Sequence, residues 1–232
     1  MENEVKSVGK NSSFDLKATI MGCLNLILAV VLKPVTALKS KIKDYADFKS
    51  AGILVLFVAL AEMIINLLGT MISVIFVKKY NFFSGETKFE VSFEGLKNLD
   101  YFQLIVKDVF WILVIVAAIA GIYYIIAMIM KKNVNFFKLA AITAVSFVPV
   151  FAASFVGIIV AYIYAPLAAF LVVAAFIYSF LIFINAIDGE VDFKDVDFKV
   201  YFHTICLTVM FIITYYVASN YIASIFGSSS LF

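Results

Sequence analysis

A single carboxylate, Glu62, interrupts the most apolar stretch of the sequence. Residues 51–76 read AGILVLFVALAEMIINLLGTMISVIF and hold no other ionisable side chain. A charge near the centre of such a helix costs about 2.5–3.5 kcal/mol on insertion scales, so Glu62 is expected to face protein or water, or to be protonated. Asn66 follows one helical turn later and can donate a hydrogen bond to it. The pair is consistent with an ion or proton site, or with a polar clamp between helices.

His203 is the only histidine of the chain. One imidazole supplies no metal-ligand set, so we expect a structural or interfacial role, with pH sensing as the alternative. Cys23 and Cys206 form no C-x-x-C pair, which excludes a zinc ribbon. The sequence contains no nucleophile elbow, no glycine-rich phosphate loop and no His-Glu metal motif. We therefore predict no catalytic residue, no metal and no cofactor.

The composition places these residues in a bilayer. Of the 232 residues, 64% are hydrophobic and 15% are charged, against about half and about a quarter in globular proteins. As a helix, residues 51–76 would extend about 39 Å, enough to cross a hydrocarbon core of about 30 Å with some tilt. All 18 basic residues are lysine. Because arginine is the usual bidentate reader of phosphate, nucleic-acid binding is not expected.

The apolar runs predict an all-α fold, a polytopic transmembrane helix bundle with five spans. Pro149 lies near the centre of the third span and is expected to kink it, because proline removes a backbone hydrogen bond. The turn before Pro166 is very short, so the third and fourth spans should form an antiparallel pair. Small residues four apart, such as Ala153 and Gly157, would let helix backbones approach. The predicted spans are 51–76, 109–130, 139–162, 165–187 and 200–225, followed by a tail at 226–232.

The segment before the first span is expected to lie at the membrane surface. Residues 1–17 form a polar tail and residues 18–50 interfacial, amphipathic helices. Residues 18–32 give only about 22 Å of helix, short for a span; the alternative is a sixth span over 18–38. After Pro34, apolar residues recur at helical spacing, and we expect the lysines beside them to contact anionic lipid. The alternative is a connector packed on the bundle. The candidate lipid-contacting lysines are Lys39, Lys41 and Lys43.

Orientation follows from the distribution of lysines. With the N-terminus in the cytoplasm, thirteen lysines lie on the inner side and five in the outer loop 77–108. Residues 88–94 of that loop alternate polar and apolar, which indicates a short strand or hairpin arm. The first residues, Met-Glu-Asn-Glu, lack the positive charge of a cleaved export signal. We predict a multi-pass protein of the bacterial plasma membrane with a cytoplasmic N-terminus and an external C-terminus.

Several short motifs in order resemble a known family. Lys33-Pro34-Val35 opens the helix before the first span, and Ala165-Pro166-Leu167 forms the tight turn. Between them come Lys131-Lys132, Phe136-Phe137-Lys138 and Ser146-Phe147-Val148-Pro149. Residues 33–225 resemble the Yip family of integral membrane proteins in its bacterial form. The resemblance implies five spans, a cytoplasmic N-terminus and no known catalysis. Eukaryotic relatives are implicated in vesicle traffic through Rab-type GTPases. Many bacterial look-alikes carry an N-terminal zinc ribbon, which this chain lacks.

Two functions are compatible with these features. The first is a non-enzymatic membrane protein that acts through partners: the lipid bilayer, a membrane protein or a second copy of itself. The alternative is a small transporter or permease subunit that uses Glu62 and the proline-broken third helix. An intramembrane enzyme has no reactive constellation to support it.

Overall fold

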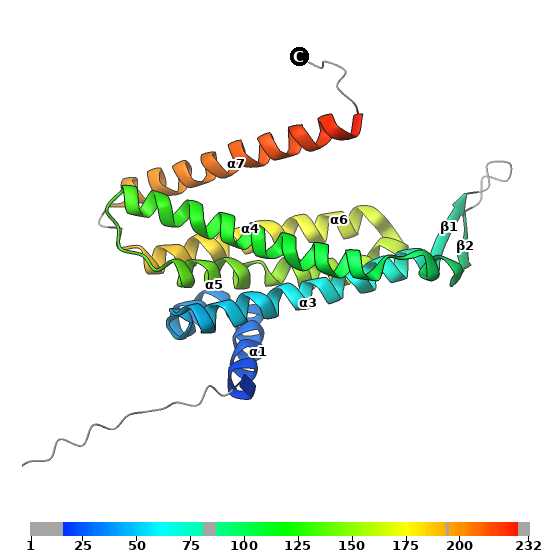
Figure 1. Cartoon of the computed structure of the whole chain (residues 1–232), viewed down its shortest axis with the longest axis horizontal. Coiled ribbons are helices and arrows are strands. Elements are labelled where there is room, and N and C mark those ends of the chain that lie inside the picture. The colour runs from blue at the N-terminus through cyan, green and yellow to red at the C-terminus, as the bar shows by residue number, and fades with distance from the viewer. Residues whose placement is uncertain (1–15, 81–86, 194, 227–232) are drawn as a thin grey trace, which may run out of the picture.

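The computed structural model describes residues 16–80, 87–193 and 195–226 of the chain. Helices make up nearly all of them, with one small hairpin (Figure 1). In chain order the elements are α1 (Leu16–Leu32), α2 (Pro34–Lys41), η1 (Ile42–Tyr45), α3 (Phe48–Ile75), β1 (Phe76–Tyr80), β2 (Thr87–Val91), η2 (Glu94–Asn98), α4 (Tyr101–Ile129), α5 (Phe136–Ser146), α6 (Val148–Glu190) and α7 (Val196–Phe226). Residues 1–15 and 227–232 of the predicted tails lie outside the described residues.

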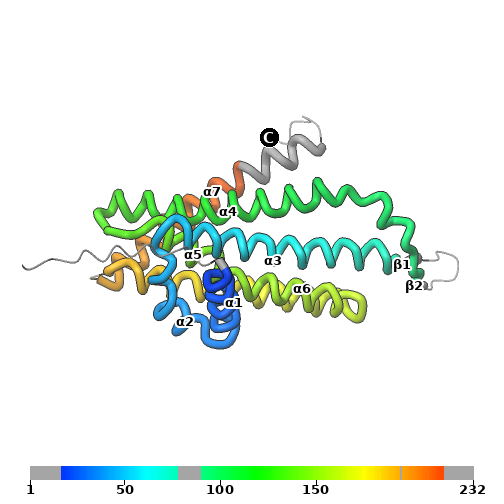
Figure 2. The backbone as a smooth tube through the Cα atoms, turned by 60° about the horizontal axis from the view of Figure 1, so that its bottom comes forward, coloured from blue at the N-terminus to red at the C-terminus, as the bar shows by residue number. Residues whose placement is uncertain are grey.

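Helices α3 and α4 form a long antiparallel pair (Figure 2). Each begins at an aspartate that caps it: the Asp47 side chain accepts hydrogen bonds from the amides of Lys49 and Ser50, and Asp100 accepts one from the amide of Gln103. Such caps satisfy amides that have no partner inside the helix. The cap at Asp100 starts α4 at Tyr101, well before the predicted boundary at residue 109, so α4 is longer than the predicted second span.

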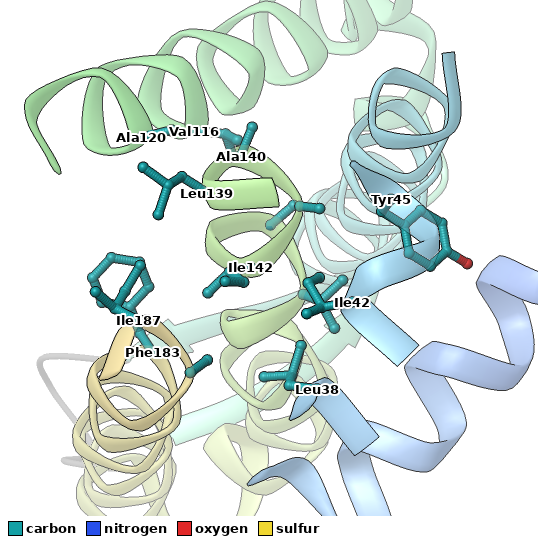
Figure 3. Close-up of a cluster of buried hydrophobic side chains, with 14 of the residues drawn as sticks. Leu38, Ile42, Tyr45, Val116, Ala120, Leu139, Ala140, Ile142, Phe183 and Ile187 are labelled. Atoms are coloured by element: carbon teal, nitrogen blue, oxygen red, sulfur yellow. The ribbon is translucent and has the colours of Figure 1, made fainter. Parts of the chain in front are cut away.

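Helix α5 is the central rod of the bundle. Every residue from Leu139 to Ser146 is buried, because α3, α4 and α6 all pack against it. Figure 3 shows side chains of α2, η1, α4 and α6 converging on this helix, with Leu139, Ala140 and Ile142 at the middle. The apolar, alanine-rich sequence of α5 has no polar face to turn outward, as expected for a helix surrounded by others.

Helix α6 turns back on itself. With α5 it forms a helical stretch of 55 residues, Phe136–Glu190, which would be about 82 Å long if straight, far more than a membrane needs. Tyr164 has non-helical angles, φ −152° and ψ 97°, just before Pro166. On either side of this kink the two halves touch, since a Cβ added at Gly157 would lie 3.6 Å from Val172 Cγ2. The predicted antiparallel pair is therefore formed by one interrupted helix.

Within the described residues, four helical stretches are long and apolar enough to cross a membrane: Phe48–Ile75, Tyr101–Ile129, Phe136–Glu190 and Val196–Tyr216. The third is the one that turns back at Tyr164, so the bundle comes close to the five predicted rods. The predicted fold class, an all-α transmembrane bundle, is confirmed. Helix α1, with 17 residues, falls short of these helices in length.

The N-terminal helices pack across one side of the bundle. Helix α1 crosses its long axis (Figure 1), and Cys23, Leu26 and Val30 on its inner face are fully buried. Its outer face is also apolar, and Leu32 is 80% exposed. The predicted apolar stripe of α2 and η1 turns inward, with Leu38 and Ile42 in the core.

A small hairpin follows α3 directly and closes that end of the bundle. Strands β1 and β2 pair antiparallel, with Phe76 opposite Val91, so a strand does occupy most of the alternating stretch 88–94. The hairpin and η2 rest on the ends of α3 and α6. The Phe76 and Tyr162 rings lie 5.8 Å apart, and the Tyr162 hydroxyl donates to the carbonyl of Ile72 at 3.1 Å. A Cβ at Gly95 would come within 2.3 Å of Val74 Cγ1, so this glycine permits the close approach of η2 to α3.

Candidate functional site

Four polar side chains from α4, α6 and α7 contact one another. They lie where α4 ends and α7 begins, at the end of the bundle opposite the hairpin (Figure 1). We call Tyr123, Asp188, Lys199 and His203 the His203 cluster. The His203 Nε2 atom lies 2.9 Å from Asp188 Oδ1, and the Lys199 ammonium pairs with Asp188 Oδ2. On the other side of the imidazole, the Tyr123 hydroxyl lies 3.5 Å from Nδ1. The four groups form a chain from the buried core towards the α6–α7 loop.

Helical geometry places these residues. Lys199 and His203 are four apart on α7 and share one face, while Asp188 lies in the last turn of α6. The His203 residue is only 7% exposed, and rings of Phe193 and Phe202 stand 5.9 Å and 5.4 Å from it. A donor atom in such a setting needs an acceptor, because a buried unpaired polar group costs about 1–3 kcal/mol. Asp188 supplies that acceptor.

The end of α6 and the loop that follows it are tied to the start of α5 and to the link before it. Lys138 forms an ion pair with Glu190 at 2.9 Å, and the Lys132 ammonium donates to the carbonyl oxygen of Asp192. The same ammonium lies 5.2 Å from the centre of the Phe198 ring, which is a cation–π distance. The acidic loop is therefore held against basic residues of the neighbouring link, and these contacts fix the start of α7.

Glu62 and Asn66 lie far from this cluster. The Asn66 side-chain amide donates to Glu62 Oε1, as the i, i+4 spacing predicts, while Oε2 is buried without a hydrogen-bond partner among the described residues. Asp108 of α4 is close enough to Glu62 to interact electrostatically. Because Asp108 and Tyr123 are fifteen residues apart on α4, about 22 Å separates their positions along the helix. The structure thus divides the predicted polar residues into two separate places.

Pro149 stands in the first turn of α6. The helical ladder breaks at Phe147, two residues earlier, and the amides of Val150 and Phe151 both point to the Phe147 carbonyl. A proline at this position loses no intrahelical bond, because the first-turn amides have no acceptor inside the helix. Next to the break between α5 and α6, the Ser146 hydroxyl is buried and has no hydrogen-bond partner in the described part of the chain.

The three candidate lysines differ in their surroundings. All three residues are exposed, but the stem of Lys39 lies along the end of α6, since its Cγ and Cε would be 3.7 Å from a Cβ placed at Gly189. Lys41 ends α2 and Lys43 lies in η1, on the outer side of the same turn. Beneath them, burial raises the pKa of Tyr45, whose hydroxyl faces Cys23 Sγ at 4.0 Å.

The partners of His203 carry a weak signal in the sequence. Asp188 appears there only as one of several acids in a loop that is easily interpreted as solvated. Lys199 four residues before His203 is the one local sign of a shared face. Tyr123 lies in an apolar run with nothing to mark it as a partner. Among the residues that the structure describes, no three His, Cys, Asp or Glu side chains are grouped to hold a metal ion.

Comparison with known proteins agrees with this architecture. The Yip1 domain family matches residues 28–218, a range that includes all the apolar rods and the whole His203 cluster. No curated protein and no solved structure matches the chain. The motifs that resemble this family in the sequence fall at the helix junctions, at Lys33-Pro34 before α2, at Lys131-Lys132 after α4 and at Pro166 in the fold-back. This multi-pass membrane chain belongs to the Yip1 domain family.

Proposed function

We propose that the protein acts without catalysis, by binding protein or lipid partners within the bilayer. The polar side chains support this most directly, because they form contacts between neighbouring elements of the bundle. Lys199, His203, Lys138 and Lys132 each meet an acceptor on a neighbouring element. In the described part of the chain these contacts join neighbouring helices, and Asp188, Glu190 and Lys199 also line an open hollow of about 440 Å³ beside the α6–α7 loop. The outward surfaces of α4, α6 and α7 expose many large apolar side chains. Such surfaces are suited to contact with lipid and with other membrane helices.

We further propose that the His203 end of the bundle faces the cytoplasm of a bacterial cell and that the C-terminus lies outside. The link at 131–135 and the end of α6 with residues 191–193 lie at one end, and the hairpin lies at the other (Figure 1). The lysine count supports this direction, because short cytoplasmic loops carry the excess of basic residues.

Two exposed positions test the orientation, Asn133 after α4 and Lys97 in η2. In a background with Cys23 and Cys206 replaced by alanine, a membrane-impermeant maleimide should label Lys97→Cys in whole cells. Asn133→Cys should react only after the membrane is permeabilised. The reverse pattern would overturn the orientation.

The binding function is tested by purification of the tagged full chain in mild detergent. We expect a stoichiometric protein or lipid to remain with it through size-exclusion chromatography, detected by mass spectrometry of the intact complex. A chain that is always recovered as a bare monomer, with neither protein nor lipid bound, would contradict the proposal. The transporter alternative has no observation in its favour beyond the presence of Glu62.

A further inference from the structure

An open groove lies between helices α4 and α7. The two helices pack together near the His203 cluster and then diverge towards the hairpin side of the bundle (Figure 1). The groove has a volume of about 630 Å³. Its wall on α4 extends from Lys107 and Trp111 to Ala118 and Ile122, and its wall on α7 includes Met210 and Ile213. It is an apolar slot with a lysine at one end.

The charge at the mouth is not neutralised by the protein. The Lys107 residue is exposed, and no carboxylate in the described ranges lies within ion-pair distance of its ammonium. The adjacent Asp108 is absent from the groove wall and interacts with Glu62 of α3. Consecutive residues on a helix point in different directions. Asp108 therefore faces α3, while Lys107 faces the groove.

The length of the groove matches one membrane leaflet. The fifteen helical steps from Lys107 to Ile122 extend about 22 Å along α4. Half of a hydrocarbon core is about 15 Å, and the headgroup region adds roughly 5–7 Å. Lys107 then stands at the depth of the phosphates and Trp111, one turn deeper, at the interface where tryptophan is enriched. The apolar remainder reaches close to the middle of the bilayer.

We propose that this groove binds one anionic phospholipid from the leaflet on the hairpin side. The lipid phosphate pairs with Lys107, and an acyl chain lies between Ala118 on α4 and Met210 on α7. A lysine ammonium binds phosphate as a point charge, and each such contact near a membrane surface favours anionic lipid by about 1 kcal/mol. This site deepens the proposed function, since it names a lipid as one of the partners.

Trp111, the only tryptophan of the chain, reports directly on the groove. The full chain is reconstituted in phosphatidylcholine vesicles that contain brominated phosphatidylglycerol or brominated phosphatidylcholine, and quenching of its fluorescence is titrated. We expect the anionic lipid to associate about fivefold more strongly than the zwitterionic lipid. Lys107→Gln should abolish this preference, and Lys107→Arg should keep it. Lys97→Gln, an exposed lysine on the same side, is the matched control and should also keep it.

Three results would overturn the site: equal quenching by the two lipids in the wild type, a preference that survives Lys107→Gln, or protection of Trp111 from both lipids. The last result, with a disulfide-linked dimer of Ala118→Cys in the cysteine-free background, would show that a second copy fills the groove. Circular dichroism and size-exclusion chromatography confirm that each variant is folded. A negative result for the lipid site would not overturn the proposed function, because a co-purifying protein partner is measured in a separate experiment.

Discussion

The His203 imidazole joins α7 to the last turn of α6, with 2.9 Å between its Nε2 atom and Asp188 Oδ1. Beyond this point α7 packs mainly against α4 and then diverges from it. The contact is sheltered, with the His203 and Asp188 side chains 9% and 16% exposed. Through Asp188, His203 and Lys199 both attach the base of α7 to the last turn of α6.

Replacement of Asp188 by alanine should destabilise the attachment of α7. The substitution leaves the His203 donor and the Lys199 ammonium without their acceptor, and hydrogen bonds to charged groups contribute about 1.5–3 kcal/mol each. We expect the free energy of unfolding of Asp188→Ala to fall by at least about 1.5–3 kcal/mol, the contribution of one such bond. The fall is measured by titration with denaturing detergent and followed by circular dichroism.

The matched control for this experiment is Asp192→Asn in the same loop. Asp192 is exposed and uses its backbone carbonyl to accept from Lys132, which the substitution keeps. This variant should unfold like the wild type. Equal stability of Asp188→Ala and Asp192→Asn would show that the His203 cluster does not hold α7.

The rods of this fold could be predicted because the bilayer imposes them. An uninterrupted apolar run of the right length has few structures open to it when no water can satisfy its backbone. The predicted span 51–76 corresponds to α3 (Phe48–Ile75) for this reason. Helix ends were less predictable, because they depend on single capping residues such as Asp100, which extends α4 back to Tyr101.

The pairing of polar side chains could not be predicted, because it depends on which helices become neighbours. Asn66 and Glu62 share one helix, so spacing alone brings them together. His203 meets Tyr123 only because α7 packs on α4, eighty residues away in the chain. From the sequence, the acidic residues after α6 are interpreted as a solvated loop, because their partners, Lys132 and Lys138, lie far away along the chain.

Glu62→Gln should stabilise the bundle. Oε2 of Glu62 is buried with no hydrogen-bond partner among the described residues, and Asp108 lies close enough to repel a charged carboxylate there. A carboxylate at such a site bears a larger desolvation penalty than a neutral amide of the same shape. We expect a gain of about 1–3 kcal/mol in the free energy of unfolding. Asn66→Leu removes the donor that the described residues supply to Glu62, so its effect on stability should have the opposite sign. A destabilised Glu62→Gln would instead indicate that the carboxylate has a bound cation as its partner.

Asp47 should make the stability of α3 depend on pH. Hydrogen bonds from the Ser50 hydroxyl, at 2.5 Å, and from the Ser50 and Lys49 amides lower the pKa of this carboxyl below its usual value. A carboxyl whose pKa is lower in the folded state than in the unfolded state stabilises the fold above the unfolded value. That contribution is lost as the pH falls through the folded value. Thermal unfolding between pH 6 and pH 3 should therefore show a steeper loss of stability in the wild type than in Asp47→Asn.

Ser50→Ala tests the cause of this shift. Because the Ser50 hydroxyl is the largest contributor to the lowered pKa, its removal should reduce the difference between the wild type and Asp47→Asn. Ser40→Ala serves as the control, since the Ser40 hydroxyl bonds the carbonyls of Thr36 and Ala37. A pH profile that is unchanged by Ser50→Ala would contradict the assignment.

Lys131→Gly should stabilise the chain. Lys131 follows the last turn of α4 with φ 55°, and its amide and that of Lys132 bond the carbonyls of Met128 and Ala127. This is a Schellman cap, in which the left-handed residue is usually glycine. A side chain there costs about 1 kcal/mol, so relief of that cost should raise the free energy of unfolding by a similar amount. Lys131→Ala removes the same charge but keeps the Cβ, so it should gain nothing. A gain shared by both variants would mean that the lysine charge, and not the backbone, limits stability at this turn.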